Sequence, residues 1–560
     1  MHRIFYVPEL VGLFIRHISV RGRPNQSVEN TDWNYSTVSE TYNSLTSEAR
    51  QNIKALGQAS KVFTEACLNE AWLFQTGLIG LLRLVGAVHV LPTSMINPSR
   101  AWKLTRRLTE EDMAVILRHS IRIQELTLWQ ELRVEDTEGA EDILAFGRAV
   151  VLFPKLRALF WHGPRTEELD FVMSTMRDGS LTHMAATTSA TIPSNFMAMV
   201  EKRRRHLEYL ELFASSNSDG DDRIGRTVQS VLSVATGLTA LHISEDVSEH
   251  LNLWDATALL PRLSKLSLVD SSSTNGGPSD GVTYPSLTFL DLQMENPDAL
   301  VQAMNSVTLP SIQKFEIKLK ARTSTHRPLN VLSAIARSCS ESSLKSLSLL
   351  VSSSRGALQD VVQLLGPDSL DMFLLFPLRH LRISMSWSWD LTDNTMERIA
   401  NRWPDIETLD IDPEGVWPTP SNVTAHGLHT LAVSCRRLYI LGMQFNSTPP
   451  DFSLTEALYS HMGGRAGSTT MGMLNVGRSA INRPAETAML LSCLCFYLAG
   501  CLPDLAMHQD EEQREICDRW IQVSQFLSMM GLARRQERWW EDHNRGDSRP
   551  GDQFFQDRSS

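Results

Sequence analysis

The sequence predicts an α/β fold, an irregular solenoid of helix-and-strand repeats preceded by a small helical domain. Two observations lead to this prediction. The pattern apolar-x-x-apolar-x-apolar occurs eleven times in near-regular order between residues 123 and 443. In the clearest copies an amphipathic helix pattern comes just before it, and a proline separates the two. A unit with one apolar helix face and one apolar strand face cannot bury both alone, so repeated copies indicate stacking.

The clearest unit is "LTDNTMERIANRWPDIETLDID" at 391–412. Four of its residues share a helix face at the spacings i, i+3, i+4 and i+7, namely Met396, Ile399, Ala400 and Trp403. Pro404 disfavours helical geometry at the residue before it, so the helix should end at Trp403. Leu409 and Ile411 then alternate with aspartates, which predicts a strand with one apolar face.

The eleven copies are spaced as repeats are. They start at Ile123, Leu156, Leu207, Leu238, Leu263, Leu287, Ile312, Leu344, Leu378, Ile406 and Leu438. Nine of the ten intervals measure 24 to 34 residues, near the roughly 20 to 29 residues of a leucine-rich repeat. The interval of 51 residues from Leu156 to Leu207 indicates one degraded or missed repeat. We therefore predict an irregular leucine-rich-repeat solenoid over 123–508; the alternative is an irregular α/β protein whose strands look alike.

The segments on either side of the repeats complete the predicted organisation. Residues 1–90 form a helical domain with a polar insertion at 21–50, and 91–122 form a helical linker or an N-terminal cap. After the repeats, an apolar stripe with alternating spacings of four and three runs through Ile516, Trp520, Val523, Leu527 and Met530. This stripe predicts a capping helix at 509–544, which we favour over a partner-binding helix, and a disordered tail at 545–560.

Composition narrows the class of protein. The net charge of −11 disfavours general binding to nucleic acid, and the single basic run at 202–205 is typical of a solvated surface. Seven scattered cysteines, an odd number, favour a reducing compartment. The apolar opening is interrupted by Pro8 and is too short to span a bilayer. We expect a cytoplasmic or nuclear protein that binds neither nucleic acid nor membranes.

No motif for catalysis or metal binding is complete. Cys493, Cys495 and Cys501 lack the further ligands that a zinc site needs at ordinary spacing, so we expect buried free thiols. The glycine-rich stretch at 461–470 has no lysine and no strand before it, unlike a phosphate-binding loop. We expect no catalytic residue, no metal and no cofactor, and hence a protein that is not an enzyme.

Two stretches near the N-terminus resemble a known family. "VPELVGLFIRHIS" at Val7–Ser19 and "ALGQASKVFTEACLNEAW" at Ala55–Trp72 together resemble an F-box. The stretch at 391–443 is similar to the repeats of fungal-type F-box/leucine-rich-repeat proteins. Two departures are the long insertion between the first two helices and Glu9-Leu10 directly after the proline. The alternative is an N-terminal helical cap on the solenoid.

The resemblance implies a function without catalysis. An F-box binds the adaptor subunit of a cullin-type ubiquitin ligase, and the repeats hold a protein target, so the chain would be a substrate-recognition subunit. The adaptor-binding residues would then be Val7, Pro8, Leu10, Leu13, Phe14, Leu56, Phe63 and Trp72. The alternative function is an interaction scaffold with the same repeats and no ligase link.

The predicted target surface is the open face of the sheet. Residues beside the core aliphatics of each strand point away from the core, and aromatic residues are frequent among them. Because exposed aromatics are common at interface hot spots, we expect target contacts at Trp129, Phe160, Phe213, Phe289, Arg382 and Asp410. The alternative is that a loop or the C-terminal segment covers the rings. The sequence identifies no particular target.

Overall fold

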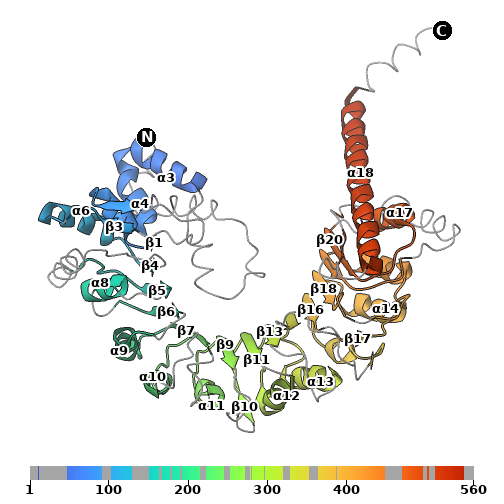
Figure 1. Cartoon of the computed structure of the whole chain (residues 1–560), viewed down its shortest axis with the longest axis horizontal. Coiled ribbons are helices and arrows are strands. Elements are labelled where there is room, and N and C mark those ends of the chain that lie inside the picture. The colour runs from blue at the N-terminus through green and yellow to red at the C-terminus, as the bar shows by residue number, and fades with distance from the viewer. Residues whose placement is uncertain are drawn as a thin grey trace, which may run out of the picture. The chain divides into compact units, whose positions relative to one another are not determined.

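A computed structural model of the chain, drawn in Figure 1, describes most of the predicted repeats. The described residues are 11, 15, 47–90, 102–106, 108–128, 151–162, 167–176, 180–188, 192–214, 222–244, 253–270, 278, 281–294, 297–319, 328–351, 364–385, 387–415, 417–447, 470–495, 498, 501–503 and 511–547. The chain divides into two compact units, Met1–Asn275 and Gly276–Ser560, and each is considered by itself.

Unit 1 contains a parallel sheet of seven described strands. In spatial order they are β1 (Phe74–Thr76), β4 (Glu125–Leu128), β5 (Ala158–His162), β6 (His183–Thr188), β7 (Tyr209–Ala214), β8 (Ala240–Ile243) and β9 (Lys265–Asp270). Each strand pairs in parallel with the next along the chain. Parallel neighbours need a crossover between them, and here the crossover segments contain the helices.

Two described helices of unit 1 precede its first described strand, and the others lie between strands in the sequence. In chain order the described helices are α3 (Ser47–Ala59), α4 (Lys61–Trp72), α5 (Ile79–Leu84), α6 (Glu110–Ser120), α8 (Glu167–Thr175), α9 (Ser194–Arg203), α10 (Asp222–Leu232) and α11 (Leu253–Ala258). Helices α8, α9 and α10 follow one another along the same side of β5, β6 and β7 (Figure 1). An antiparallel pair, β2 (Val88–Val90) with β3 (Trp102–Leu104), lies between α5 and α6 in the sequence.

Unit 2 repeats this arrangement with eight described strands in its main sheet. They are β11 (Phe289–Met294), β13 (Lys314–Leu319), β14 (Ser346–Val351), β16 (His380–Ser384), β18 (Thr408–Ile411), β19 (Ile440–Gly442), β20 (Met473–Gly477) and β21 (Cys501–Pro503). Two small parallel pairs accompany it, β10 (Val282–Thr283) with β12 (Val307–Thr308) and β15 (Leu364–Leu365) with β17 (Ser388–Trp389). The connecting helices are α12 (Pro297–Ser306), α13 (Pro328–Ser338), the 3-10 turn η3 (Asp371–Phe373), α14 (Asp393–Arg402), α15 (Ala425–Ser434) and α17 (Pro484–Leu494).

The predicted α/β repeat fold is confirmed, and each of the eleven predicted copies leads into a parallel strand. The long interval after Leu156 contains one further repeat, which forms β6. Its core positions are Leu181, Met184 and Ala186, all buried. The aliphatic pattern missed this repeat because methionine and alanine occupy two of its three core positions. In the main parallel sheets, β1, β20 and β21 are the other three described strands that the pattern did not find.

Within each unit the repeats stack through a continuous apolar layer. In unit 2 the pairing register aligns Leu290, Phe315, Leu347, Leu381 and Leu409, and all five are fully buried. In unit 1 the corresponding layer contains Leu126, Leu159, Met184, Leu210 and Leu241, which are equally buried. Burial of each such side chain contributes about 1.5 to 3 kcal/mol, so stacking is the main source of stability here.

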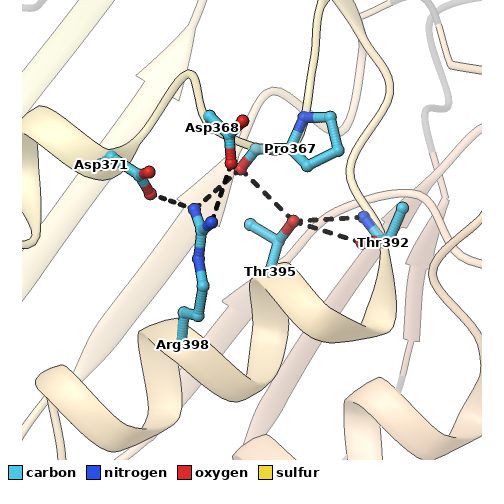
Figure 2. Close-up of polar contacts among 6 residues, drawn as sticks. All are labelled: Pro367, Asp368, Asp371, Thr392, Thr395 and Arg398. Carbon is cyan, nitrogen blue, oxygen red and sulfur yellow. Dashed lines mark hydrogen bonds and ion pairs between the residues drawn. The ribbon is translucent and has the colours of Figure 1, made fainter.

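Polar side chains also connect one repeat to the next, most clearly at α14. Figure 2 shows Arg398 of this helix extending to the preceding repeat, where its guanidinium pairs with Asp368 at 2.8 Å and with Asp371, and donates to the Pro367 carbonyl at 3.1 Å. Thr395, one turn earlier, donates to the same carbonyl at 3.4 Å. Arg398 therefore gives the α14 repeat a fixed polar contact with its neighbour.

The start of α15 is held by the helix before it. Asp393 accepts hydrogen bonds from the backbone N–H groups of Thr424 at 2.7 Å and Gly427 at 3.1 Å, and from the Thr424 hydroxyl at 2.6 Å. The two backbone N–H groups lie at the start of the helix, where no carbonyl of the helix can accept from them. A Cβ atom at position 427 would lie 2.5 Å from Asp393 Oδ1, so the close approach needs glycine.

The last helix, α18 (Glu511–Asp547), covers the end of the unit 2 sheet with its first half and continues beyond it (Figure 1). Trp520, Val523 and Leu527 of the predicted stripe are buried, whereas Ile516 and Met530 are half-buried; Cys517, which was not predicted, is buried beside them. The Trp520 indole N–H donates to the Ser479 carbonyl at 2.8 Å, and its ring meets Phe445 edge-on at 5.7 Å. The final core layer of the solenoid is thereby covered.

Candidate functional site

The open face of the unit 2 sheet is the strongest candidate for a recognition surface. It is formed by the strand residues that alternate with the buried layer, and the register places them in rows across the strands. One row contains Asp291, Glu316, Ser348, Arg382, Asp410, Gly442 and Asn475, and the row beside it Phe289, Lys314, Ser346, His380, Thr408, Ile440 and Met473. Four of the seven residues in the first row are charged, whereas the second row has Lys314 and His380 among mostly uncharged residues.

Two ion pairs stand on this face. On β13, Lys314 Nζ lies 2.9 Å from Glu316 Oε1 and also 5.4 Å from the centre of the Phe289 ring. Between β16 and β18, Arg382 Nε lies 3.4 Å from Asp410 Oδ2. The Arg382 side chain is 58% exposed whereas that of Asp410 is 12% exposed, so the guanidinium is the accessible member of the second pair. Serines of β14 separate the two pairs.

Asp410 is held in an unusual environment for a carboxylate. Its Oδ1 atom is buried and has no hydrogen-bond partner among the described residues. Gly442 lies against it, and a Cβ there would come within 2.1 Å of Oδ1. Burial raises the pKa of Asp410 from 3.8 to about 6, Arg382 opposes the rise, and Glu414 adds to it. The carboxyl group therefore gains or loses its proton close to neutral pH.

A second charged group borders this pair at the edge where the strands begin. Glu407 lies 3.9 Å from His380 Nε2 and 3.7 Å from Arg437. Together with Arg382 and Asp410 these residues make a surface with charged groups of both signs. Charges of both signs can orient a partner of complementary charge.

The open face of unit 1 is different because its centre is apolar and buried. Phe160, Tyr209 and three alanines form one cluster at Ala158, Phe160, Ala185, Tyr209 and Ala240. The Tyr209 hydroxyl donates to Glu211 Oε2 at 2.5 Å, and Thr187 donates to the other carboxylate oxygen at 3.4 Å. Burial lowers the pKa of His162, at the end of β5, to about 4.

The predicted target-binding residues divide accordingly. Arg382 and Asp410 are brought together as a pair on the open face of unit 2. Phe213 is half-buried, and its ring stacks on His242 at 6.3 Å. Trp129 lies outside the described residues.

The expected exposure of two aromatic rings is wrong. Phe160 is fully buried and Phe289 is 5% exposed, although the strand register places both on the open face as expected. Phe160 packs within the apolar cluster of unit 1, and the Phe289 ring lies beneath Lys314. Neither ring in this conformation offers a target the exposed apolar surface that a hot-spot contact needs.

The helical pair at the N-terminal end has a small core of its own. Val11, Ile15, Ile53, Phe63 and Cys67 are buried together, and Leu56 packs against them half-buried. Helix α4 begins after Ser60, whose hydroxyl accepts from the Val62 N–H at 3.4 Å. Phe63, predicted to bind an adaptor, thus lies in the internal core. The predicted contacts Val7, Pro8, Leu10, Leu13 and Phe14 lie outside the described residues.

The far end of α4 contacts the first repeat. Trp72 is half-buried, and its ring lies 4.9 Å from that of His119 in α6. Arg122 bonds two residues of α4, Glu65 at 2.5 Å and Asn69 at 3.0 Å. Part of the Trp72 side chain, which was predicted to bind the adaptor, is therefore covered by a contact within the chain.

Sequence reasoning missed one residue of this domain. Val62 is 37% exposed, although it stands next to the buried Phe63. The exposure of Val62 could have been predicted from the helix pattern, because Val62 lies outside the apolar stripe. An apolar residue outside such a stripe faces solvent or a partner.

The three cysteines near the end of the repeats are free thiols, as expected. Cys495 and Cys501 are buried and Cys493 is half-buried. Burial raises the pKa of Cys495 to about 12 and raises that of Cys501 as well. Within the described ranges, no three His, Cys, Asp or Glu side chains are grouped so as to hold a metal ion. No described helix is long and apolar enough to cross a membrane.

Comparison with known proteins finds matches among solved structures. No family model and no curated protein matches the sequence. Among solved structures, the crystal structure of the Rad7 and Elc1 complex in yeast aligns with 84% of this chain and 97% of the matched chain, at 10% sequence identity and a TM-score of 0.31. This likeness is distant, and the fold is defined by the helices and strands described above.

Proposed function

We propose that this chain is the substrate-recognition subunit of a cullin-type ubiquitin ligase. In this proposal the N-terminal helices bind the adaptor subunit, and the open face of the repeats binds a protein target. Support comes from the resemblance of Val7–Ser19 and Ala55–Trp72 to an F-box, together with the repeat sheet that follows them.

The observation that supports it best is the division of apolar side chains around α4. Phe63 and Cys67 pack inward against Val11 and Ile15, whereas Val62 points outward with 37% of its surface exposed. A domain that binds a partner needs both an internal core and an outward apolar band. Pro8 and Leu10 of the resembling stretch would extend that band.

The target side of the proposal rests on charge. Arg382 is exposed and is held beside Asp410, with Lys314 and Glu316 two strands away on the same face. Fixed charges of both signs select a partner by complementary charge. The ligase function then follows from proximity, because one chain that binds both adaptor and target raises the effective concentration of the target.

One observation favours a second function, a repeat scaffold without a ligase link. Arg122 joins α4 to the first repeat through Glu65 and Asn69, and Trp72 packs on His119. These contacts are what a helical cap on the solenoid would make. Under this function the N-terminal helices would cover the sheet and bind no adaptor.

Co-expression of the full chain with an adaptor subunit distinguishes the two functions. Copurification of the wild-type chain, with loss of the adaptor from Pro8→Asp and Leu10→Asp, is the expected result. Phe63→Ala is the matched structural variant, and it should lower the melting temperature because it opens a cavity in the core at Ile53 and Cys67. If the folded wild-type chain retains no adaptor, the ligase proposal fails and the scaffold function stands.

A further inference from the structure

Helix α18 has a second apolar face that the capping role does not use. Five large apolar side chains on it are exposed, and we call them the outer stripe: Ile521 at 41%, Met529 at 56%, Leu532 at 60%, Trp539 at 53% and Trp540 at 52%. At about 100° per residue, the centre of this stripe lies roughly opposite the buried Trp520 and Leu527. The helix therefore packs on its own repeats with one side and offers an apolar surface on the other.

The area of the outer stripe is large for a surface that meets only water. Its five side chains together expose on the order of 500 Å² of apolar surface, if large side chains have about 150 to 250 Å² each. Monomeric proteins rarely leave more than a few hundred Å² of contiguous apolar surface exposed. Two copies joined through the stripe would bury about 1,000 Å² in all, which is near the lower limit for a specific interface.

The order of residues along the stripe matches an antiparallel copy of itself. With the two-fold axis between residues 530 and 531, Ile521 lies opposite Trp540 of a second copy and Met529 lies opposite Leu532. Gln525 and Gln536, both exposed, also lie opposite each other. The smaller Ile521 side chain thus packs against the larger Trp540 ring. The Gln525 and Gln536 amides can hydrogen-bond to each other, because each both donates and accepts. A parallel pair would instead place tryptophan on tryptophan and align the helix dipoles unfavourably.

We propose that the chain forms a homodimer in which the outer stripes of two α18 helices pack against each other in antiparallel orientation. The interface is isologous, because each copy contributes the same five side chains. The first half of α18 stays on its own repeats through Trp520, so pairing needs no rearrangement of the cap. This inference is independent of the ligase proposal. A dimer would carry two copies of the open face and could bind a repeated target with avidity.

Sedimentation of the full chain over a range of concentrations tests the dimer. The wild-type chain should dimerise at micromolar concentration, and Leu532→Glu should weaken dimerisation on the order of a hundredfold, since a two-fold interface loses the contact twice. Leu259→Glu is the control because Leu259 is 81% exposed in unit 1. Circular dichroism should be the same for all three. A wild-type chain that stays monomeric at every concentration overturns the proposal, as does equal dimerisation of the Leu532→Glu chain.

Disulfide trapping tests the orientation. The double variant Gln525→Cys, Gln536→Cys should cross-link two chains under mild oxidation, whereas either single variant should not. Residues 525 and 536 lie about 16 Å apart along one helix, too far for a bond within it or between like positions of an antiparallel pair. The wild-type chain, with seven cysteines of its own, gives the background. Rapid cross-linking by a single variant overturns the antiparallel pair. Monomeric protein that instead cosediments with anionic lipid vesicles through the stripe overturns the dimer.

Discussion

Replacing Asp410 by asparagine should stabilise the protein at neutral pH. The carboxyl group of Asp410 is buried on the open face, and its pKa rises from 3.8 to about 6 because of that burial. A folded-state pKa above the unfolded value means that the native state binds the proton more tightly. Stability therefore falls as the pH rises from about 4 through about 6, and above that range the native state contains an unfavourable buried charge.

The magnitude follows from the shift. At about 1.4 kcal/mol per pKa unit, a rise of roughly two units corresponds to at most about 3 kcal/mol above pH 7. Asparagine keeps the shape and removes the charge, so Asp410→Asn should gain about 1 to 3 kcal/mol near pH 8. Loss of the ion pair with Arg382 should reduce this gain in stability only slightly, because the guanidinium is 58% exposed and surface pairs contribute about 0 to 1 kcal/mol.

Urea unfolding of wild type and variant at several values between about pH 4 and pH 8 measures this. The difference in unfolding free energy should be small at the acid end, grow through about pH 6 and then level off. Asp405→Asn, an exposed aspartate of the same repeat, is the matched control and should show no such trend. A difference that does not vary with pH, or a less stable Asp410→Asn at pH 8, would refute the reasoning.

Three further substitutions test the packing of unit 2, each by urea unfolding. Trp520→Ala should lower the free energy of unfolding by about 4 kcal/mol, because it empties a fully buried position and removes the hydrogen bond to the Ser479 carbonyl. Trp520→Phe should lower it by less than half of that. Equal losses for the two variants would contradict the packing argument. Asp412→Ala should cost about 3 kcal/mol, since this buried carboxylate accepts from the Trp387 N–H at 2.6 Å and the Trp389 indole at 3.2 Å, and a loss under about 1 kcal/mol would argue against those bonds. Gly442→Ala should destabilise the wild-type chain by about 1 to 3 kcal/mol, because its Cβ would meet Asp410 Oδ1 at 2.1 Å, but should be tolerated beside Asp410→Ala; additive effects would show that the two sites are not in contact.

The sequence predicted the repeats well because their pattern is local. Each strand has its core aliphatics within six residues, and period-two alternation then assigns the face, as it did for Arg382 and Asp410. The pattern failed where other apolar residues replace aliphatics, as at Met184 and Ala186 in β6. It also gave no indication of β21, where Cys501 occupies the core position.

Burial on the open face could not be predicted in the same way. Phe160 is buried because Ala185 and Tyr209, 25 and 49 residues further along the chain, pack around it. The raised pKa of Asp410 likewise depends on the depth at which the carboxyl group lies and on Arg382 of the preceding repeat. Contacts of this kind are set by the pairing register, which the apolar pattern alone does not specify.

The affinity of the full chain for the adaptor subunit tests the central claim most directly. Isothermal titration should give a defined dissociation constant for wild type, and Val62→Asp should weaken it at least tenfold while leaving the melting temperature nearly unchanged, because the Val62 side chain is 37% exposed. Val433→Asp, at a side chain 39% exposed on α15, is the matched control and should bind as wild type does. No measurable binding by the folded wild-type chain, or equal affinities for both variants, would contradict the assignment of these helices as the adaptor-binding domain.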